Sequence, residues 1–189
     1  MGTHEAHPEV ETFVEMWRYT LPWCITLNDA GKYSYSASKN KIYGDYYRFI
    51  MGIRGVAHDF DDRWKQSKTD SLEHDNVVLK IEQLWTKGSE FFFHGRFMDD
   101  IGITLSDDKV FAKSYASKNA IAVSLWNNTD KALAFNVTVD AKRILLVANK
   151  IKEVTSLETN RRIPFKTSGN NINIQLQIPA NSISIVVLR

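Results

Sequence analysis

The sequence has few of the features that tie a chain to redox, membrane or nucleic-acid chemistry. It has 189 residues and one cysteine, Cys24, so a disulfide within the chain does not contribute to the fold. No run approaches the roughly 20 apolar residues that a membrane-spanning helix needs. Residues 1–7 hold no apolar signal core. We expect no membrane partner, and the localisation stays unknown.

Strong charge and phosphate-binding motifs are also missing. The net charge is only +2, which gives no argument for a nucleic-acid partner. No glycine-rich phosphate loop, nucleophile elbow or paired-cysteine metal motif occurs, so we expect no cofactor. The sequence is 43% hydrophobic and 24% charged, which is typical of a soluble globular protein with one domain or two small ones.

The clearest pattern in the chain is a series of short strands in its last third, each followed by turn residues. The expected strands are Val110–Tyr115, Ile121–Trp126, Ala132–Val139, Ile172–Ile178 and Ser182–Leu188. In the fourth of these, apolar residues alternate strictly with Asn173, Gln175 and Gln177, which predicts one buried and one solvated face. Strands of this length and spacing predict an antiparallel sandwich or open barrel.

The first half has helical periodicity around one apolar strand. Helices are expected over 8–20, over 43–55 and from Asp70 to Gly88, the last with Val77, Ile81, Leu84 and Trp85 as its inner stripe. Trp23–Leu27 forms a short strand that Asn28–Gly31 should end. A strand apolar on both faces, reached directly from a helix, is typical of a parallel α/β sheet. The expected fold class is therefore α+β, a helical first part followed by an antiparallel sandwich.

A single strand with flanking helices does not close a parallel sheet by itself. We therefore interpret residues 1–97 as the helical end of a larger α/β domain and residues 98–189 as the β-sandwich. Phe91–Phe97, which could continue a helix or begin a strand, marks the junction.

This order of elements resembles the C-terminal region of (β/α)-barrel glycoside hydrolases, where the last barrel strand and helix lead into an antiparallel β-sandwich. The resemblance rests on five motifs: Tyr19–Asn28 at the last barrel strand, Gly95–Phe97 at the junction, Ser124–Thr129 in a strand and turn, Val154–Phe165 as a hairpin, and Ile178–Leu188 as the closing strand.

The resemblance implies that the catalytic carboxylates come from the carboxyl ends of barrel strands. Most of those strands are missing from this sequence. Asn28 and Asp29, which follow the apolar strand, would then lie at the rim of the substrate cleft. Glu5 is the candidate for a remnant of a catalytic strand end. The implied partner is a carbohydrate, bound through the parent catalytic domain.

Other candidate sites have simpler interpretations. His4, Glu5 and His7 could bind a metal, but a solvated terminus is favoured, and no metal site is expected. The acidic group Asp59, Asp61 and Asp62 lacks the glycine and glutamate of a calcium loop. Adjacent strand residues point to opposite faces, so Asp99 and Asp100 are not expected to act as a catalytic pair. Asp99 or Asp100 is instead expected to bond the junction backbone.

Two glycosylation patterns, at Asn127 and Asn136, are interpreted as chance matches. The aromatic residues that could stack on a sugar are Tyr33, Tyr35, Tyr43 and Trp64. Scattered surface aromatics are, however, also normal.

The leading hypothesis is a C-terminal fragment of a glycoside hydrolase, with the sandwich as an accessory, stabilising domain that is not catalytic alone. The alternatives are a stand-alone carbohydrate-binding module and a structural protein that forms a dimer. Sugar binding that depends on Trp64 or Tyr35 would favour the first alternative. A stable dimer without sugar affinity would favour the second.

Overall fold

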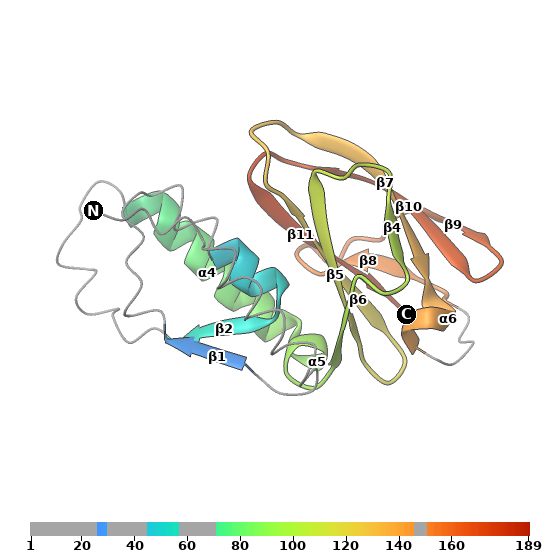
Figure 1. Ribbon diagram of the computed structural model, residues 1–189, viewed down its shortest axis with the longest axis horizontal. Helices are drawn as coiled ribbons and strands as arrows, with labels where there is room; N and C mark the ends of the chain where they lie inside the picture. Colours follow the sequence, from blue (N-terminus) through green and yellow to red (C-terminus); the bar gives the residue numbers. More distant parts are fainter. Residues whose placement is uncertain (1–25, 30–44, 57–70, 146–150) are drawn as a thin grey trace. The chain divides into compact units, whose positions relative to one another are not determined.

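The computed structural model describes residues 26–29, 45–56, 71–145 and 151–189, and for 26–29, 53–56, 71–75 and 145 it describes the backbone only. The chain divides into two compact units, Met1–Thr86 and Lys87–Arg189. The predicted α+β class is confirmed, because a helical first part precedes two antiparallel sheets (Figure 1). The helix expected over 8–20 lies outside the described residues.

The first unit contains a parallel strand pair, as the apolar strand predicted. Strand β1 (Thr26–Asp29) pairs with β2 (Ile53–Val56) in parallel. Two predictions were wrong here. Asn28 and Asp29 do not end the strand but form its last two positions. The described part of the unit also has two strands, where we expected one.

The second strand was missed because its sequence continued a helical pattern. The chain is helical over 45–50 and not to residue 55 as expected. A turn follows at Met51–Gly52, and Gly52 has φ +68°, a conformation that favours glycine. The β-branched residues Ile53 and Val56 then favour an extended backbone.

The third expected helix is confirmed. Helix α4 (Ser71–Lys87) buries Ile81, Leu84 and Trp85, and Gly88 follows it directly. The rings of Phe49 and Trp85 meet edge to face with centroids 5.8 Å apart. This aromatic contact joins the short helix over 45–50 to α4 inside the first unit.

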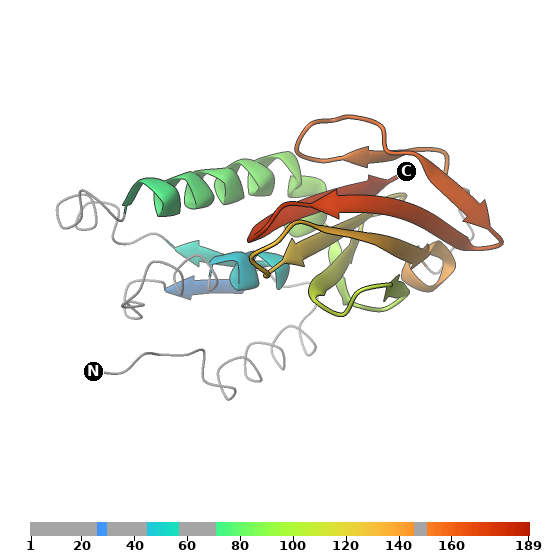
Figure 2. The same ribbon diagram turned by 90° about the horizontal axis from the view of Figure 1, so that it is seen from above.

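The second unit opens with a short helix and then forms a sandwich of two antiparallel sheets, seen as two layers in Figure 2. Helix α5 covers Ser89–Phe92. The five-stranded sheet has the order β3-β5-β6-β11-β8. Its strands are β3 (Arg96–Asp99), β5 (Val110–Ala116), β6 (Ile121–Asn127), β11 (Ser182–Leu188) and β8 (Val154–Ser156).

The four-stranded sheet has the order β4-β7-β10-β9. Its strands are β4 (Ile103–Leu105), β7 (Leu133–Asp140), β10 (Asn171–Ile178) and β9 (Phe165–Ser168). The short helix α6 (Ala141–Leu145) follows β7 directly. The backbone N–H of Arg143 donates to the carboxylate of Asp140, at 3.2 Å, and so satisfies one free donor at the start of this helix.

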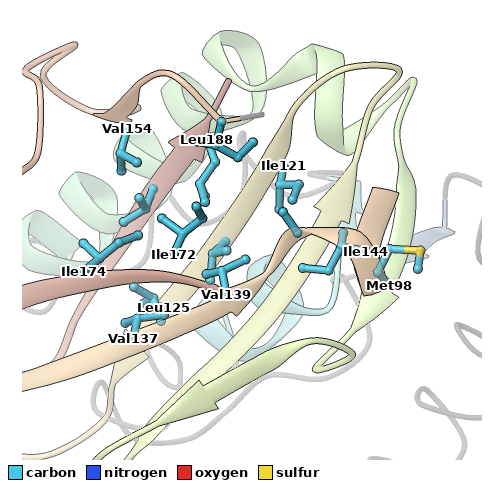
Figure 3. Close-up of a cluster of buried hydrophobic side chains, with 14 of the residues drawn as sticks. Met98, Ile121, Leu125, Val137, Val139, Ile144, Val154, Ile172, Ile174 and Leu188 are labelled. Carbon is cyan, nitrogen blue, oxygen red and sulfur yellow. The ribbon is translucent and has the colours of Figure 1, made fainter. Parts of the chain in front are cut away.

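One hydrophobic core lies between the two sheets (Figure 3). Ile121 and Leu125 of β6 meet Val137 and Val139 of β7, and Met98 and Ile144 close one side of the cluster. The alternation predicted for β10 is confirmed, with its Ile residues buried and Gln175 and Gln177 exposed.

The segment Phe91–Phe97, left ambiguous by the sequence, divides between α5 and β3. Phe91 lies on α5 and Phe97 lies on β3, and both side chains are buried. Strand β3 spans the domain boundary expected between residues 97 and 98, and it pairs with β5. The assignment of the first part to the end of a barrel stays a prediction.

Candidate functional site

The predicted cleft residues lie at the carboxyl end of the parallel pair. In the β1–β2 register, Asn28 lies opposite Gly55 and Asp29 opposite Val56, so both residues occupy the last positions of β1. In (β/α)-barrels the active site forms at the carboxyl ends of the strands. Their place at a strand end is therefore compatible with a rim position, and their role stays a prediction.

The other N-terminal candidate residues lie outside the part of the chain that the structure describes. Glu5, His4, His7, Cys24, the Asp59–Asp62 group and the aromatic residues Tyr33, Tyr35, Tyr43 and Trp64 lie outside the described residues. Across the described ranges, no group of three or more His, Cys, Asp or Glu side chains is placed to hold a metal ion. Among the helices described, none combines the length and hydropathy needed to cross a membrane.

Asp99 forms an ion pair and is not part of a carboxylate dyad. It has φ +56°, at an irregularity where the β3–β5 register shifts between Phe97 and Asp99. Its carboxylate pairs with the ammonium of Lys113, and both side chains are mostly buried. The hydroxyl of Ser114 donates to the Asp99 backbone carbonyl at 3.1 Å. These contacts fix the bulge where the second unit begins its sandwich.

Asn127 is a fully buried hydrogen-bonding centre and is thus unavailable as a glycosylation acceptor. Its Nδ2 donates to the backbone carbonyls of Lys131, Ile178 and Pro179 at 2.8–3.1 Å. Its Oδ1 accepts from the backbone N–H of Thr129 at 3.0 Å and from the Thr129 hydroxyl at 2.7 Å. One amide therefore joins the β6–β7 turn to the end of β10.

A salt bridge ties α5 to the last residue of the sequence. The guanidinium of Arg189 donates to the Glu90 carboxylate at 2.7 Å, and Ser117 Oγ donates to the same carboxylate at 2.6 Å. The Arg189 guanidinium also lies 5.6 Å from the centre of the Phe91 ring. The hydrogen bond from Arg189 lowers the pKa of Glu90, partial burial opposes this, and the Ser117 hydroxyl adds to the lowering.

The five-stranded sheet is buried on both faces. All seven residues of β6 are buried, although only alternate ones face the sandwich core. The opposite face, which we call the outer face, carries Trp126 of β6 and Ile183, Ile185 and Val187 of β11, each at most 3% exposed. Phe111 lies at its margin, 40% exposed and 5.3 Å from the Trp126 ring.

The outward face of the four-stranded sheet has the opposite character. It carries a set of side-chain amides on neighbouring positions of β7 and β10, which we call the amide face: Asn136, Asn171, Asn173, Gln175 and Gln177. Thr104 and Thr138 extend it toward β4. The sequence predicted the solvated position of the β10 residues but not their meeting with Asn136.

Solved structures with a similar fold include an alpha-amylase and two glucanotransferases. A maltogenic alpha-amylase from Thermotoga neapolitana has a TM-score of 0.57 and 12% identity, and the match covers 95% of this chain and 45% of that one. The cyclomaltodextrin glucanotransferase CldA has a TM-score of 0.56 and 10% identity, with 95% and 40% covered.

A cycloisomaltooligosaccharide glucanotransferase from Paenibacillus sp., solved with cycloisomaltoheptaose, has a TM-score of 0.56 and 11% identity, with 86% and 27% covered. The chain has the fold of a part of these enzymes. It spans less than half the length of each. No family model matches the sequence, and no curated protein matches it. The fold resemblance predicted from the five motifs is confirmed, and identities this low carry the fold alone.

Several features of the second unit were not visible in the sequence. The partners of Asp99 and Glu90 lie 14 and 99 residues away, too far for a local pattern.

Asn127 did carry a signal, because it ends an apolar strand and begins a turn of Asn, Thr and Asp residues. The double burial of β6 was visible too, since that segment is apolar on both faces.

Proposed function

We propose that this chain is the C-terminal part of a glycoside hydrolase, and that its β-sandwich is an accessory domain that stabilises the catalytic barrel. The fold of the amylase and glucanotransferase structures supports the enzyme class. The partial coverage of those structures supports a role as one part of a longer enzyme.

The observation that carries the accessory role is the outer face of the five-stranded sheet. A sandwich needs one apolar face on each sheet for its own core. The four-stranded sheet follows this rule, with a polar outward face. The five-stranded sheet has a second apolar face with Trp126, Ile183 and Ile185. This face is already covered within the chain, except at its margin, where Phe111 is 40% exposed. In the proposal the barrel of the longer enzyme packs at that margin and extends the cover.

The chain alone is expected to lack glycosidase activity. Glycoside hydrolysis generally needs two carboxylates at a defined separation, one as acid and one as base or nucleophile. In the proposal, the carboxylates stand on barrel strands outside this sequence. Asn28 and Asp29 would contribute to the cleft rim only.

The test is an activity measurement on the purified chain with soluble starch, cyclodextrins and aryl α-glycosides. The expected result is no turnover above a blank that contains no protein. Turnover that is abolished in Asp29→Ala and kept in Asp108→Ala, an exposed aspartate in the second unit, would overturn the proposal. Asp29 would then belong to a complete active site.

A further inference from the structure

Strand β9 forms one edge of the four-stranded sheet (Figure 1), and its open backbone groups can be identified. In an antiparallel sheet, successive residues of a strand bond alternately to the neighbour on one side and to the neighbour on the other. The backbone N–H of Ala141 donates to the carbonyl of Asn170 at 3.3 Å, so Asn170 faces β7. By alternation, Asn171 and Asn173 bond to β9.

The same alternation gives the direction of the groups on β9. Lys166 and Ser168 bond to β10, because they lie opposite these two residues. Phe165 and Thr167 therefore direct their backbone N–H and C=O groups away from the sheet. Within the described part of the chain these four groups have no hydrogen-bond partner. The edge thus offers two donors and two acceptors at the spacing of an antiparallel ladder.

The β8 edge of the five-stranded sheet is, by contrast, closed. The backbone N–H of Ile163 donates to the Val154 carbonyl at 2.8 Å, and that of Ser156 donates to the Arg161 carbonyl at 2.9 Å. The connection from β8 to β9 therefore covers β8 before it reaches Pro164 and enters β9. No described segment covers β9 in this way. An uncovered edge is a template for another extended chain.

The side chains of β9 indicate what such a chain should carry. Lys166, opposite Asn173, is exposed and makes no ion pair within the described residues. Phe165, opposite Ile174, packs against the core but stays partly exposed. A strand added at this edge would place one residue beside Lys166, and the residues before and after it beside Phe165 and Thr167. An acidic residue complements the ammonium group, and apolar neighbours cover the aromatic ring.

We propose that the β9 edge binds an extended acidic peptide by adding it as a strand, with an acidic residue opposite Lys166 and an apolar residue on each side of it. In this mode of recognition, main-chain hydrogen bonds supply affinity and the alternating side chains supply specificity. A second copy of the edge fits less well. Self-pairing that uses all four open groups places the two Lys166 side chains directly opposite each other, and like charges at such positions destabilise the pair.

The experiment is an NMR titration of the purified, isotope-labelled chain with the peptide acetyl-Thr-Val-Glu-Val-Thr-amide. A second peptide, with Lys in place of Glu, is matched in length and shape. The Glu peptide should shift the amide signals of Phe165 and Thr167 with a Kd on the order of 1 mM. The Lys peptide should bind at least about threefold more weakly, because it places a cation beside Lys166.

The matched variants reverse one charge each. Lys166→Glu should weaken the Glu peptide and strengthen the Lys peptide, each by at least about threefold. Lys118→Glu, the same change at an exposed position in the turn between β5 and β6, should leave both affinities unchanged. An exchange of preference between the two peptides requires direct pairing with residue 166, which a general loss of stability would not produce.

Two results would overturn this inference. One is the absence of saturable shifts at Phe165 and Thr167 with the Glu peptide. The other is equal affinity of the two peptides for the native chain and for Lys166→Glu, which would make Lys166 a guard that keeps the edge unpaired. Neither result bears on the accessory role, because hydrolysis and the size of the native enzyme are measured separately.

Discussion

Asn127 shows how one buried polar residue organises a turn. Its NH₂ group, which has two hydrogens, lies within hydrogen-bond distance of three backbone carbonyls, and its Oδ1 accepts two hydrogen bonds from Thr129. A buried carbonyl that loses its donor carries the full penalty of desolvation, about 1–3 kcal/mol. The same sequence pattern would look like a glycosylation acceptor, and only its burial decides against that interpretation.

Asn127→Ala should lower the free energy of unfolding by about 3 kcal/mol, because the carbonyls of Lys131, Ile178 and Pro179 lose their donor. Urea unfolding measures the change. Asn128→Ala, at the neighbouring and less buried position, should change it by less than about 1 kcal/mol. Equal effects of the two variants would contradict a role for the Asn127 amide.

Glycine is required at position 88 because a side chain there would clash with the ring of Phe92. A Cβ at this position would lie 2.3 Å from the ring of Phe92, which is itself buried against Tyr115 with ring centroids 5.0 Å apart. Gly88→Ala should therefore destabilise the chain by about 1–3 kcal/mol through overpacking.

Gly169 provides the contrast for this prediction. It has open space around its Cα but φ +60°, so Gly169→Ala should cost about 1 kcal/mol through backbone strain alone. Gly88→Ala should cost less stability in a Phe92→Leu background than in the native background, whereas the cost of Gly169→Ala should be the same in both. Equal costs of Gly88→Ala in the two backgrounds, measured by urea unfolding, would show that steric conflict with Phe92 is not the cause.

At the scale of elements, the salt bridge between α5 and the end of β11 gives a pH dependence. The folded-state pKa of Glu90 is lowered from its ordinary value of 4.5. Stability from the pair is therefore fully present above about pH 4.5 and is lost as the pH falls through the lower folded pKa. Both side chains are substantially exposed, so the contribution is about 0.5 kcal/mol or less.

Glu90→Gln should be less stable than the native chain at pH 7, and the difference should be smaller at pH 3, because protonation of Glu90 weakens its pair with Arg189. Thermal unfolding at both values, in low salt, measures this difference. Asp108→Asn in the second unit is the control for removing one exposed charge. A difference that stays constant from pH 7 to pH 3 would contradict the ion-pair origin.

The elements that sequence reasoning found are those with a long, regular pattern. Strands β5, β6, β7, β10 and β11 have seven or eight residues each, and in β10 the alternation placed the buried and solvated faces correctly. The missed strands have three or four residues, including β2, β4 and β9. Segments this short contain too few residues for a period to appear. Strands β4 and β9 form because the longer strands β7 and β10 pair with them.

For the candidate site, the sequence could place residues on elements but could not bring them together. Asn28 and Asp29 were expected to follow the first strand, but they form its last two positions. The solvated side of β10 was predicted. Its pairing with β7, which completes the amide face, depends on a connection of some thirty residues that no local pattern specifies.

At the scale of the whole molecule, the two faces of the sandwich differ in a way that one isolated domain does not require. The four-stranded sheet presents a polar surface, whereas the five-stranded sheet has apolar residues on both sides. In the account proposed here, the apolar side belongs to the contact with a catalytic barrel. This assignment is a proposal that rests on the composition of the two faces.

The most direct test of the central claim is the size of the native polypeptide, measured by immunoblot of source cells with antibodies raised against the second unit. The sequence alone has a mass of 21.7 kDa. Because the chain spans 45% of the similar amylase, the account predicts a polypeptide of roughly twice that mass or more. A single band at 21.7 kDa, with no larger species, would contradict it.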